Sequence, residues 1–122
     1  MASLAIAFPL PSGKTDAWRR YIEELKGPRR AEWENLLRRA GLERHNFYLQ
    51  RTPLGDTMIL YIEGDIARSF AFFATDEDAF TQWVRRQVIE TEGVDLTQPF
   101  PGPLPEVALE SVAAAAEARM PA

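Results

Sequence analysis

The stretch RHNFYLQR-TPLG-DTMILYIEG, residues 44–64, decides the fold of this chain. Apolar and polar side chains alternate on both sides of the central TPLG, which is the pattern of two half-buried strands. Proline at the second and glycine at the fourth position of Thr52–Gly55 suit a type I turn between them. The stretch therefore predicts an antiparallel hairpin with strands at Arg44–Arg51 and Asp56–Gly64.

If Thr52 pairs with Thr57, large aliphatic side chains share one face of this hairpin, where Leu49 lies opposite Leu60. The other face is expected to carry Asn46, Tyr48, Gln50, Ile59, Tyr61 and Glu63. Two opposed tyrosines beside small residues suit packing against a second sheet, so these six residues are the predicted dimer interface. Exposure to solvent and a ligand-binding wall are the alternatives.

The segments around the hairpin alternate between strand and helix patterns. Period-2 alternation predicts a first strand at Ser3–Phe8, with Ala5 and Ala7 on one face. Helical spacing then runs across Gly27-Pro28, which predicts two helices, the second opened by Pro28, or one kinked helix. After the hairpin we expect a short helix and then a longer one. The spacing of Ile66, Phe70 and Phe73 predicts the short helix. The longer helix is expected to be capped by Thr75 and to end at Gly93.

The C-terminal part of the chain is rich in proline. Val94–Pro105 holds four prolines and is predicted to be an extended loop. Residues 106–112 fit a fourth strand, or else a helix that begins at Pro105. We expect residues 1–112 to form a single domain and residues 113–122 to be a frayed tail.

The order strand, long helix, strand, tight turn, strand, helical region predicts an α+β fold. Specifically, it predicts an antiparallel sheet of the split βαβ (ferredoxin-like) type, which often pairs into homodimers. This order predicts the architecture but does not identify a reaction.

The composition excludes several classes of function. A net charge of −4 argues against a nucleic-acid partner, and the absence of cysteine excludes thiolate metal sites and cysteine nucleophiles. A single histidine excludes a centre built on several histidines, so we expect no metal and no cofactor. No apolar run approaches about 18 residues, and the N-terminus lacks a basic leader. A cytoplasmic protein without a membrane partner is therefore predicted.

His45 is the main candidate for chemistry. The period-2 pattern places its side chain on the same face as that of Phe47, toward the helices. There it is either a hydrogen-bonded structural residue or a general base in a pocket. The predicted ligand-binding residues are Trp33, Tyr48, Trp83, Arg29 and Arg30. For the tryptophans the alternative is core packing, and for the arginines it is a solvated helix face.

Several motifs resemble a small bacterial family of unknown function that is grouped with the dimeric α/β barrels. The motifs are Gly27-Pro28-Arg29-Arg30, Thr52-Pro53-Leu54-Gly55-Asp56, Tyr61-Ile62-Glu63-Gly64-Asp65 and Gly93-Val94-Asp95-Leu96-Thr97-Gln98-Pro99. The resemblance covers residues 3–112 and implies a homodimer in which two four-stranded sheets pack face to face, with ligands between sheet and helices.

Two functions follow as expectations. The first is a non-catalytic or small-ligand-sensing homodimer. The second is a cofactor-independent enzyme, oxygenase-like or isomerase-like, that acts on a small aromatic or lipophilic metabolite with His45 as its base. The resemblance itself assigns no catalytic residue.

Overall fold

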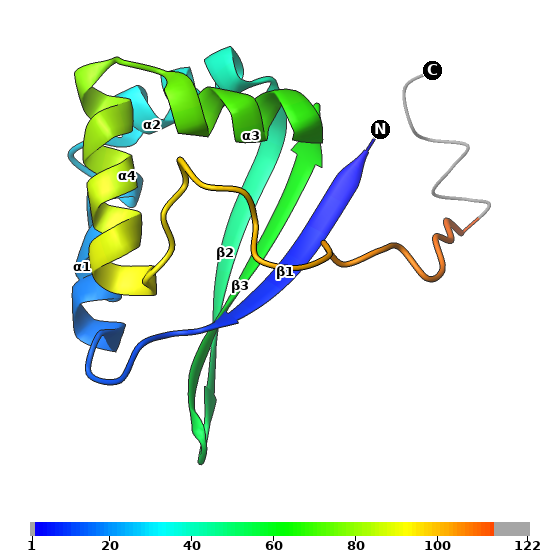
Figure 1. Ribbon diagram of the computed structural model, residues 1–122, viewed down its shortest axis with the longest axis horizontal. Coiled ribbons are helices and arrows are strands. Elements are labelled where there is room, and N and C mark those ends of the chain that lie inside the picture. The colour runs from blue at the N-terminus through cyan, green and yellow to red at the C-terminus, as the bar shows by residue number, and fades with distance from the viewer. Residues whose placement is uncertain (1, 114–122) are drawn as a thin grey trace.

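The computed structural model describes residues 2–113 of the chain, and within them three strands and four helices follow one another (Figure 1). They are β1 (Ser3–Pro9), α1 (Thr15–Lys26), α2 (Arg30–Ala40), β2 (Leu42–Thr52), β3 (Gly55–Gly64), α3 (Ile66–Thr75) and α4 (Ala79–Glu92). The strands form one sheet in the order β1-β3-β2, with antiparallel pairing throughout. The predicted α+β class and antiparallel sheet are confirmed.

The hairpin of β2 and β3 forms where the sequence predicts it, but its register differs by two residues. Thr52 pairs with Gly55, and not with Thr57. The turn is this tight because the Thr52 hydroxyl accepts a hydrogen bond from the Leu54 N–H (3.2 Å) and donates one to the Gly55 carbonyl (2.7 Å). A shift of two residues leaves every side chain on its predicted face.

The four helices cover one face of the sheet, and the core lies between them and the strands (Figure 1). Buried side chains from the sheet include Leu4, Ile6, Met58 and Ile62, and those from the helices include Tyr21, Leu36 and Val84. Each such side chain contributes roughly 1.5–3 kcal/mol by leaving water.

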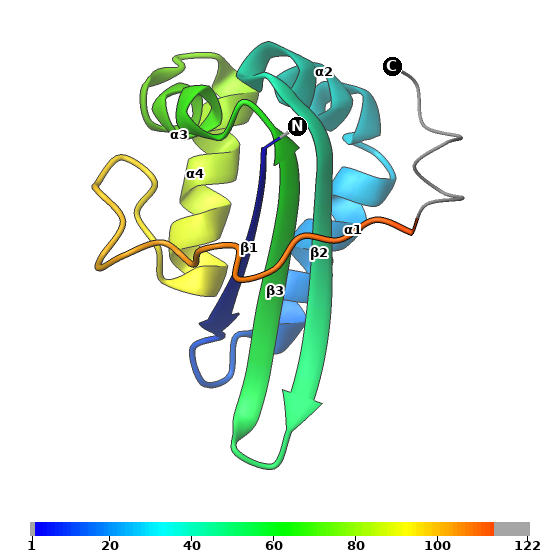
Figure 2. The ribbon, with the colours of Figure 1, turned by 90° about the vertical axis from the view of Figure 1, so that its right-hand side faces the viewer.

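The opposite face of the sheet has no helix on it within residues 2–113, and Figure 2 views the molecule from this side. We call it the open face. Its side chains are Ser3, Ala5 and Ala7 from β1, Arg44, Asn46, Tyr48 and Gln50 from β2, and Thr57, Ile59, Tyr61 and Glu63 from β3.

Gly64 ends β3 at a point where the start of β2 passes close to it. Its φ is +139°, and a Cβ built there would lie 2.5 Å from the Gly41 carbonyl oxygen and 2.9 Å from Leu42 Cα. The same Gly41 oxygen accepts a hydrogen bond of 2.9 Å from the Asp65 N–H. Only glycine fits this junction without a shift of the backbone.

The predicted cap of α4 at Thr75 is wrong, and α1 begins without a capping side chain. Thr15 lies in the first turn of α1, and its hydroxyl donates to the Asp56 carboxylate (2.7 Å) because β3 packs beside it. Thr75 is the last residue of α3, and Asp78 caps α4 by accepting a hydrogen bond from the Phe80 N–H (3.2 Å).

The chain forms two helices across Gly27-Pro28, as expected, although the second begins two residues after Pro28, at Arg30. None of the helices within residues 2–113 has the length and apolarity needed to cross a membrane.

After α4 the described chain continues without helix or strand. Phe100 packs beside β1, with its ring centroid 5.7 Å from that of Phe8, and residues 101–113 are all exposed. Residues 106–112 form neither the predicted strand nor the alternative helix. The predicted tail, 113–122, lies outside the described residues except for residue 113.

Candidate functional site

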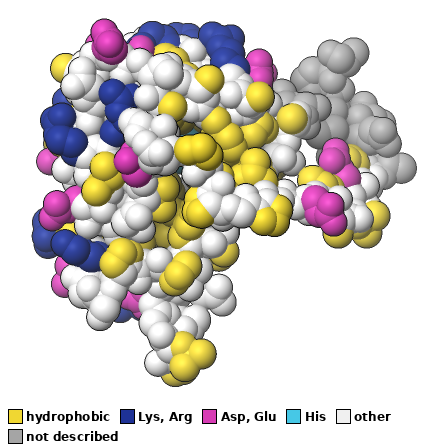
Figure 3. Space-filling model, viewed as in Figure 1, with side chains coloured by type: hydrophobic (Ala, Val, Ile, Leu, Met, Phe, Trp, Pro, Cys, Tyr) yellow, Lys and Arg dark blue, Asp and Glu magenta, His cyan; other side chains and the backbone are white. Residues whose placement is uncertain are grey.

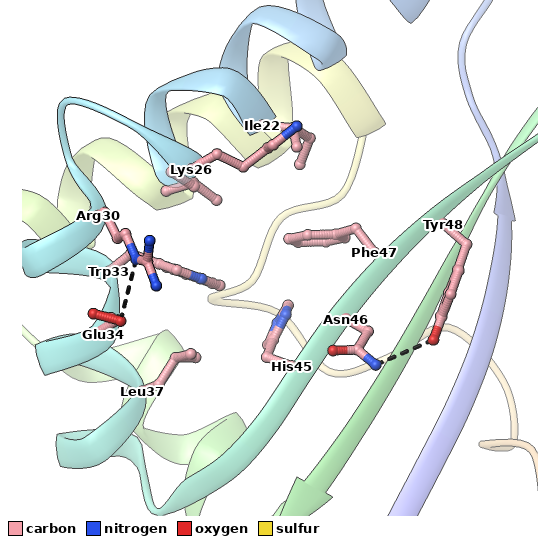
Figure 4. Close-up of a pocket in the computed structure, with 11 residues that line it drawn as sticks. Ile22, Lys26, Arg30, Trp33, Glu34, Leu37, His45, Asn46, Phe47 and Tyr48 are labelled. Atoms are coloured by element: carbon pink, nitrogen blue, oxygen red, sulfur yellow. Dashed lines mark hydrogen bonds and ion pairs between the residues drawn. The ribbon is translucent and has the colours of Figure 1, made fainter.

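A groove of about 650 Å³ runs between helices α1 and α2 and the outer strand β2 (Figure 4). This volume lies within the range of about 300–1,000 Å³ that is typical of small-molecule sites. Its lining residues are Ile22, Leu25, Lys26, Arg30, Trp33, Glu34, Leu37, His45, Asn46, Phe47 and Tyr48. The lining is mainly apolar and aromatic, with charged groups on the helices.

His45 points from β2 toward the helices, as period 2 predicts, together with Phe47 (Figure 4). The Trp33 ring meets the imidazole edge-on at 4.9 Å between centroids, and the Phe47 ring lies at 4.7 Å. The imidazole Nδ1 is buried and has no hydrogen-bond partner among the described residues. Burial lowers the pKa of His45 to about 3, so the ring is neutral at pH 7.

A neutral imidazole in this position is better suited to hydrogen bonding than to proton abstraction. A general base works best when its pKa lies near the working pH, and the pKa of His45 lies far below neutrality. Nδ1 is closed off from solvent, so a ligand in the groove can reach only the part of the imidazole that is exposed there. The site therefore has the chemistry of a binding pocket for an apolar molecule with a polar group.

The structure brings only part of the predicted pocket wall together. Trp33 lies beside His45 in the groove. Tyr48 contributes to the lining from β2, but its side chain is on the open face, is 50% exposed, and accepts a hydrogen bond from Asn46 Nδ2 (3.1 Å).

Trp83 and Arg29 lie away from the groove. Trp83 stacks on Phe80, with 5.5 Å between the ring centroids. The Arg29 guanidinium lies 4.3 Å from the Trp83 ring and donates to Glu32 (Nε–Oε1, 2.9 Å), so its charge is already engaged. Of the two arginines predicted to bind a ligand, Arg30 lines the groove and Arg29 does not.

The six predicted interface residues share the open face, as their spacing requires. Several of their polar groups are paired within it. Tyr61 donates to Glu63 (2.7 Å), and Arg44 donates to the other oxygen of the same carboxylate (2.9 Å). Because these groups are paired, a second sheet can cover them without leaving them unsatisfied.

Glu92 is a buried carboxyl group that the sequence analysis did not identify. It is 9% exposed, and the Trp18 Nε1–H donates to its Oε2 (3.1 Å). Burial raises the pKa of Glu92 to about 7, and the hydrogen bond from Trp18 offsets part of this effect. No local pattern marks this residue, because its burial comes from the packing of α1 against α4. It does not line the groove, so we assign it to the contact between α1 and α4 and not to the site.

Residues 2–113 contain no cluster of three or more histidine, aspartate and glutamate side chains that could hold a metal ion. No family model, curated protein or solved structure matches the chain, so the resemblance to the dimeric α/β barrels stays a prediction.

Proposed function

We propose that this chain is a non-catalytic homodimeric protein that binds a small, largely apolar molecule in the groove. One observation carries the proposal: the groove of about 650 Å³ has a mainly aromatic and apolar lining and contains the partly exposed, neutral imidazole of His45. A ligand with one hydrogen-bonding group and an aromatic or aliphatic body would match this lining.

The fold supports the homodimer. The order β1-β3-β2 with helices on one face is compatible with a split βαβ (ferredoxin-like) sheet that lacks its fourth strand. Its open face combines Ile59 and Tyr61 with the exposed Ala5 and Ala7, and small side chains permit a second sheet to approach closely. The resemblance to the dimeric α/β barrels predicts the same face-to-face pairing.

The dimer is tested by placing a charge on the open face. We expect Tyr61→Glu to convert a dimer into a monomer of unchanged helicity, because the new carboxylate would be buried beside Glu63. Ala7→Arg should do the same from β1. Ala71→Glu is the matched control, since Ala71 is exposed on α3 on the other side of the sheet. Sedimentation velocity measures the result, and a dimer that survives both variants contradicts the interface.

The groove is tested by filling it. The probe is anilinonaphthalene sulfonate, an apolar fluorophore with one charged group. We expect Ile22→Trp to weaken its binding at least about tenfold, which corresponds to about 1.4 kcal/mol, because the indole occupies the groove. Ile89→Trp makes the same change on α4, where Ile89 is 51% exposed and does not line the groove. Equal affinities for the two variants would place the probe elsewhere.

A further inference from the structure

The C-terminal arm, residues 104–113, has the sequence of a strand but pairs with no strand within residues 2–113. Val107 and Leu109 alternate with Glu106, Ala108 and Glu110, so one face would be apolar and the other acidic. Val107 is 57% exposed and Leu109 is 83% exposed. In Figures 1 and 3 the arm extends away from the sheet, with hydrophobic and acidic side chains that stand clear of the rest of the molecule.

Two strand edges are available to such a segment. The sheet order leaves the outer edges of both β1 and β2 unpaired within residues 2–113. The backbone N–H and C=O groups along an unpaired edge can bind an extended segment as an added strand. The arm does not pair with its own β1, although Phe100 holds the chain beside that strand.

The edge of β2 offers the arm apolar contacts. Besides the groove, a second hollow of about 220 Å³ follows the same strand. It is lined by Trp18, Arg19, Ile22, Glu23, Lys26, Phe47 and Leu49. A strand added to β2 with Val107 and Leu109 turned toward the helices would cover Phe47 and Leu49, and it would close the outer side of the groove.

Charge also favours β2 over β1. With Val107 and Leu109 turned toward the helices, Glu106 and Glu110 of the arm lie on the open face, where β2 carries Arg44. By contrast, β1 (Ser3–Pro9) has no charged residue, so an acidic strand gains no ion pair from that strand.

The arm has the reach to arrive at β2 of a second copy. Face-to-face sheets lie about 10 Å apart, and three extended residues span about the same distance. In a pair whose two-fold axis runs along the strands, β2 of one copy lies over β1 of the other. The arm leaves its own sheet beside β1 and extends outward from the open face in Figure 1, and in Figure 2 it passes in front of the three strands.

We propose that the arm of each copy adds as a fourth strand to the edge of β2 in the second copy and forms the outer wall of its groove. This inference rests on the proposed homodimer and names the part of the partner that completes the binding site. Each groove in the assembly is then built from two chains, and ligand binding is coupled to dimer formation.

Cross-linking tests the proposal directly, because the chain has no cysteine and any pair of thiols can be introduced cleanly. The test variant carries Ala108→Cys with Asn46→Cys on β2. The matched control carries Ala108→Cys with Ala5→Cys on β1. Asn46 and Ala5 both lie opposite Tyr61, on the same face and at the same level of the sheet. A short bismaleimide, followed by denaturing electrophoresis, shows which pair is linked.

We expect a covalent dimer from the Asn46 pair and little from the Ala5 pair. A covalent dimer mainly from the Ala5 pair would overturn the choice of β2. A linked monomer from the Asn46 pair would show that the arm folds back on its own chain, and no link at all would show that it adds to neither edge. The last two results overturn the exchange.

A substitution in the arm separates this proposal from the open-face interface. We expect Leu109→Asp to raise the dimer dissociation constant at least about tenfold. Leu54→Asp is the matched control at the hairpin tip, where Leu54 is 100% exposed. A monomeric full-length chain contradicts the proposed dimer itself. A dimer that Leu109→Asp leaves unchanged, with no Ala108–Asn46 link, contradicts the exchange alone.

Discussion

Replacing Gly64 by alanine is expected to lower the free energy of unfolding by at least about 3 kcal/mol. Two effects add at this position. The φ of +139° is one that residues with a Cβ rarely adopt, and the new methyl group would lie 2.5 Å from the Gly41 carbonyl oxygen. That oxygen belongs to the backbone and already accepts the Asp65 N–H, so it cannot move away without breaking this hydrogen bond.

Gly55 provides a matched control for the Gly64 variant. Its φ of +132° is close to that of Gly64, but a Cβ there would meet nothing within 4 Å. Gly55→Ala should therefore show the backbone strain alone, about 1–3 kcal/mol. Urea unfolding at equal protein concentration measures both variants. Equal losses of stability would mean that β2 retreats from Gly64 without cost, which contradicts the close approach.

The hairpin shows what the sequence could and could not predict about the fold. The alternation of side chains determined which face each residue takes, and this prediction is correct from His45 to Glu63. The register was wrong, because pairing Thr52 with Thr57 or with Gly55 gives the same two faces. The hydrogen bonds of the Thr52 hydroxyl decide between them, and no periodic pattern reveals those bonds.

The candidate site shows a similar division. The direction of His45 and the helix position of Trp33 follow from periodicity, so their meeting was predictable. The placement of Trp83 beneath Arg29 was not, because it depends on how α4 packs beside the start of α2. The burial of Glu92 likewise depends on the contact between α1 and α4, which joins residues 74 positions apart. Contacts between segments that are distant in the chain therefore could not be predicted from this single sequence.

Glu92→Gln is expected to stabilise the protein above pH 7 by about 3 kcal/mol and to have little effect below pH 4.5. Burial raises the pKa of Glu92 from 4.5 to about 7 in the folded chain. The folded state therefore keeps a proton that the unfolded state releases, and stability falls as the pH rises between these two values. Glutamine remains neutral and keeps an oxygen that can accept the Trp18 N–H.

Burial of His45 acts in the opposite sense. Its pKa falls from 6.5 to about 3 on folding, so stability is lost as the pH drops from 6.5 toward 3. Between pH 4.5 and 6.5 the two groups oppose each other, and their contributions to the slope cancel in the wild type. In Glu92→Gln only the His45 contribution remains, so the difference in stability between variant and wild type grows by about 1.4 kcal/mol per pH unit.

Thermal or urea unfolding from pH 4 to pH 8, at one protein concentration, measures this difference. Glu90→Gln is the matched control on the same helix, where Glu90 is exposed and pairs with Lys14 at 3.6 Å. We expect that control to change stability by less than about 0.5 kcal/mol at every pH. A difference for Glu92→Gln that stays constant across the range would show that folding does not shift the pKa of Glu92. In that case Glu92 would bind as many protons in the folded as in the unfolded state at every pH, and the opposition to His45 would not exist.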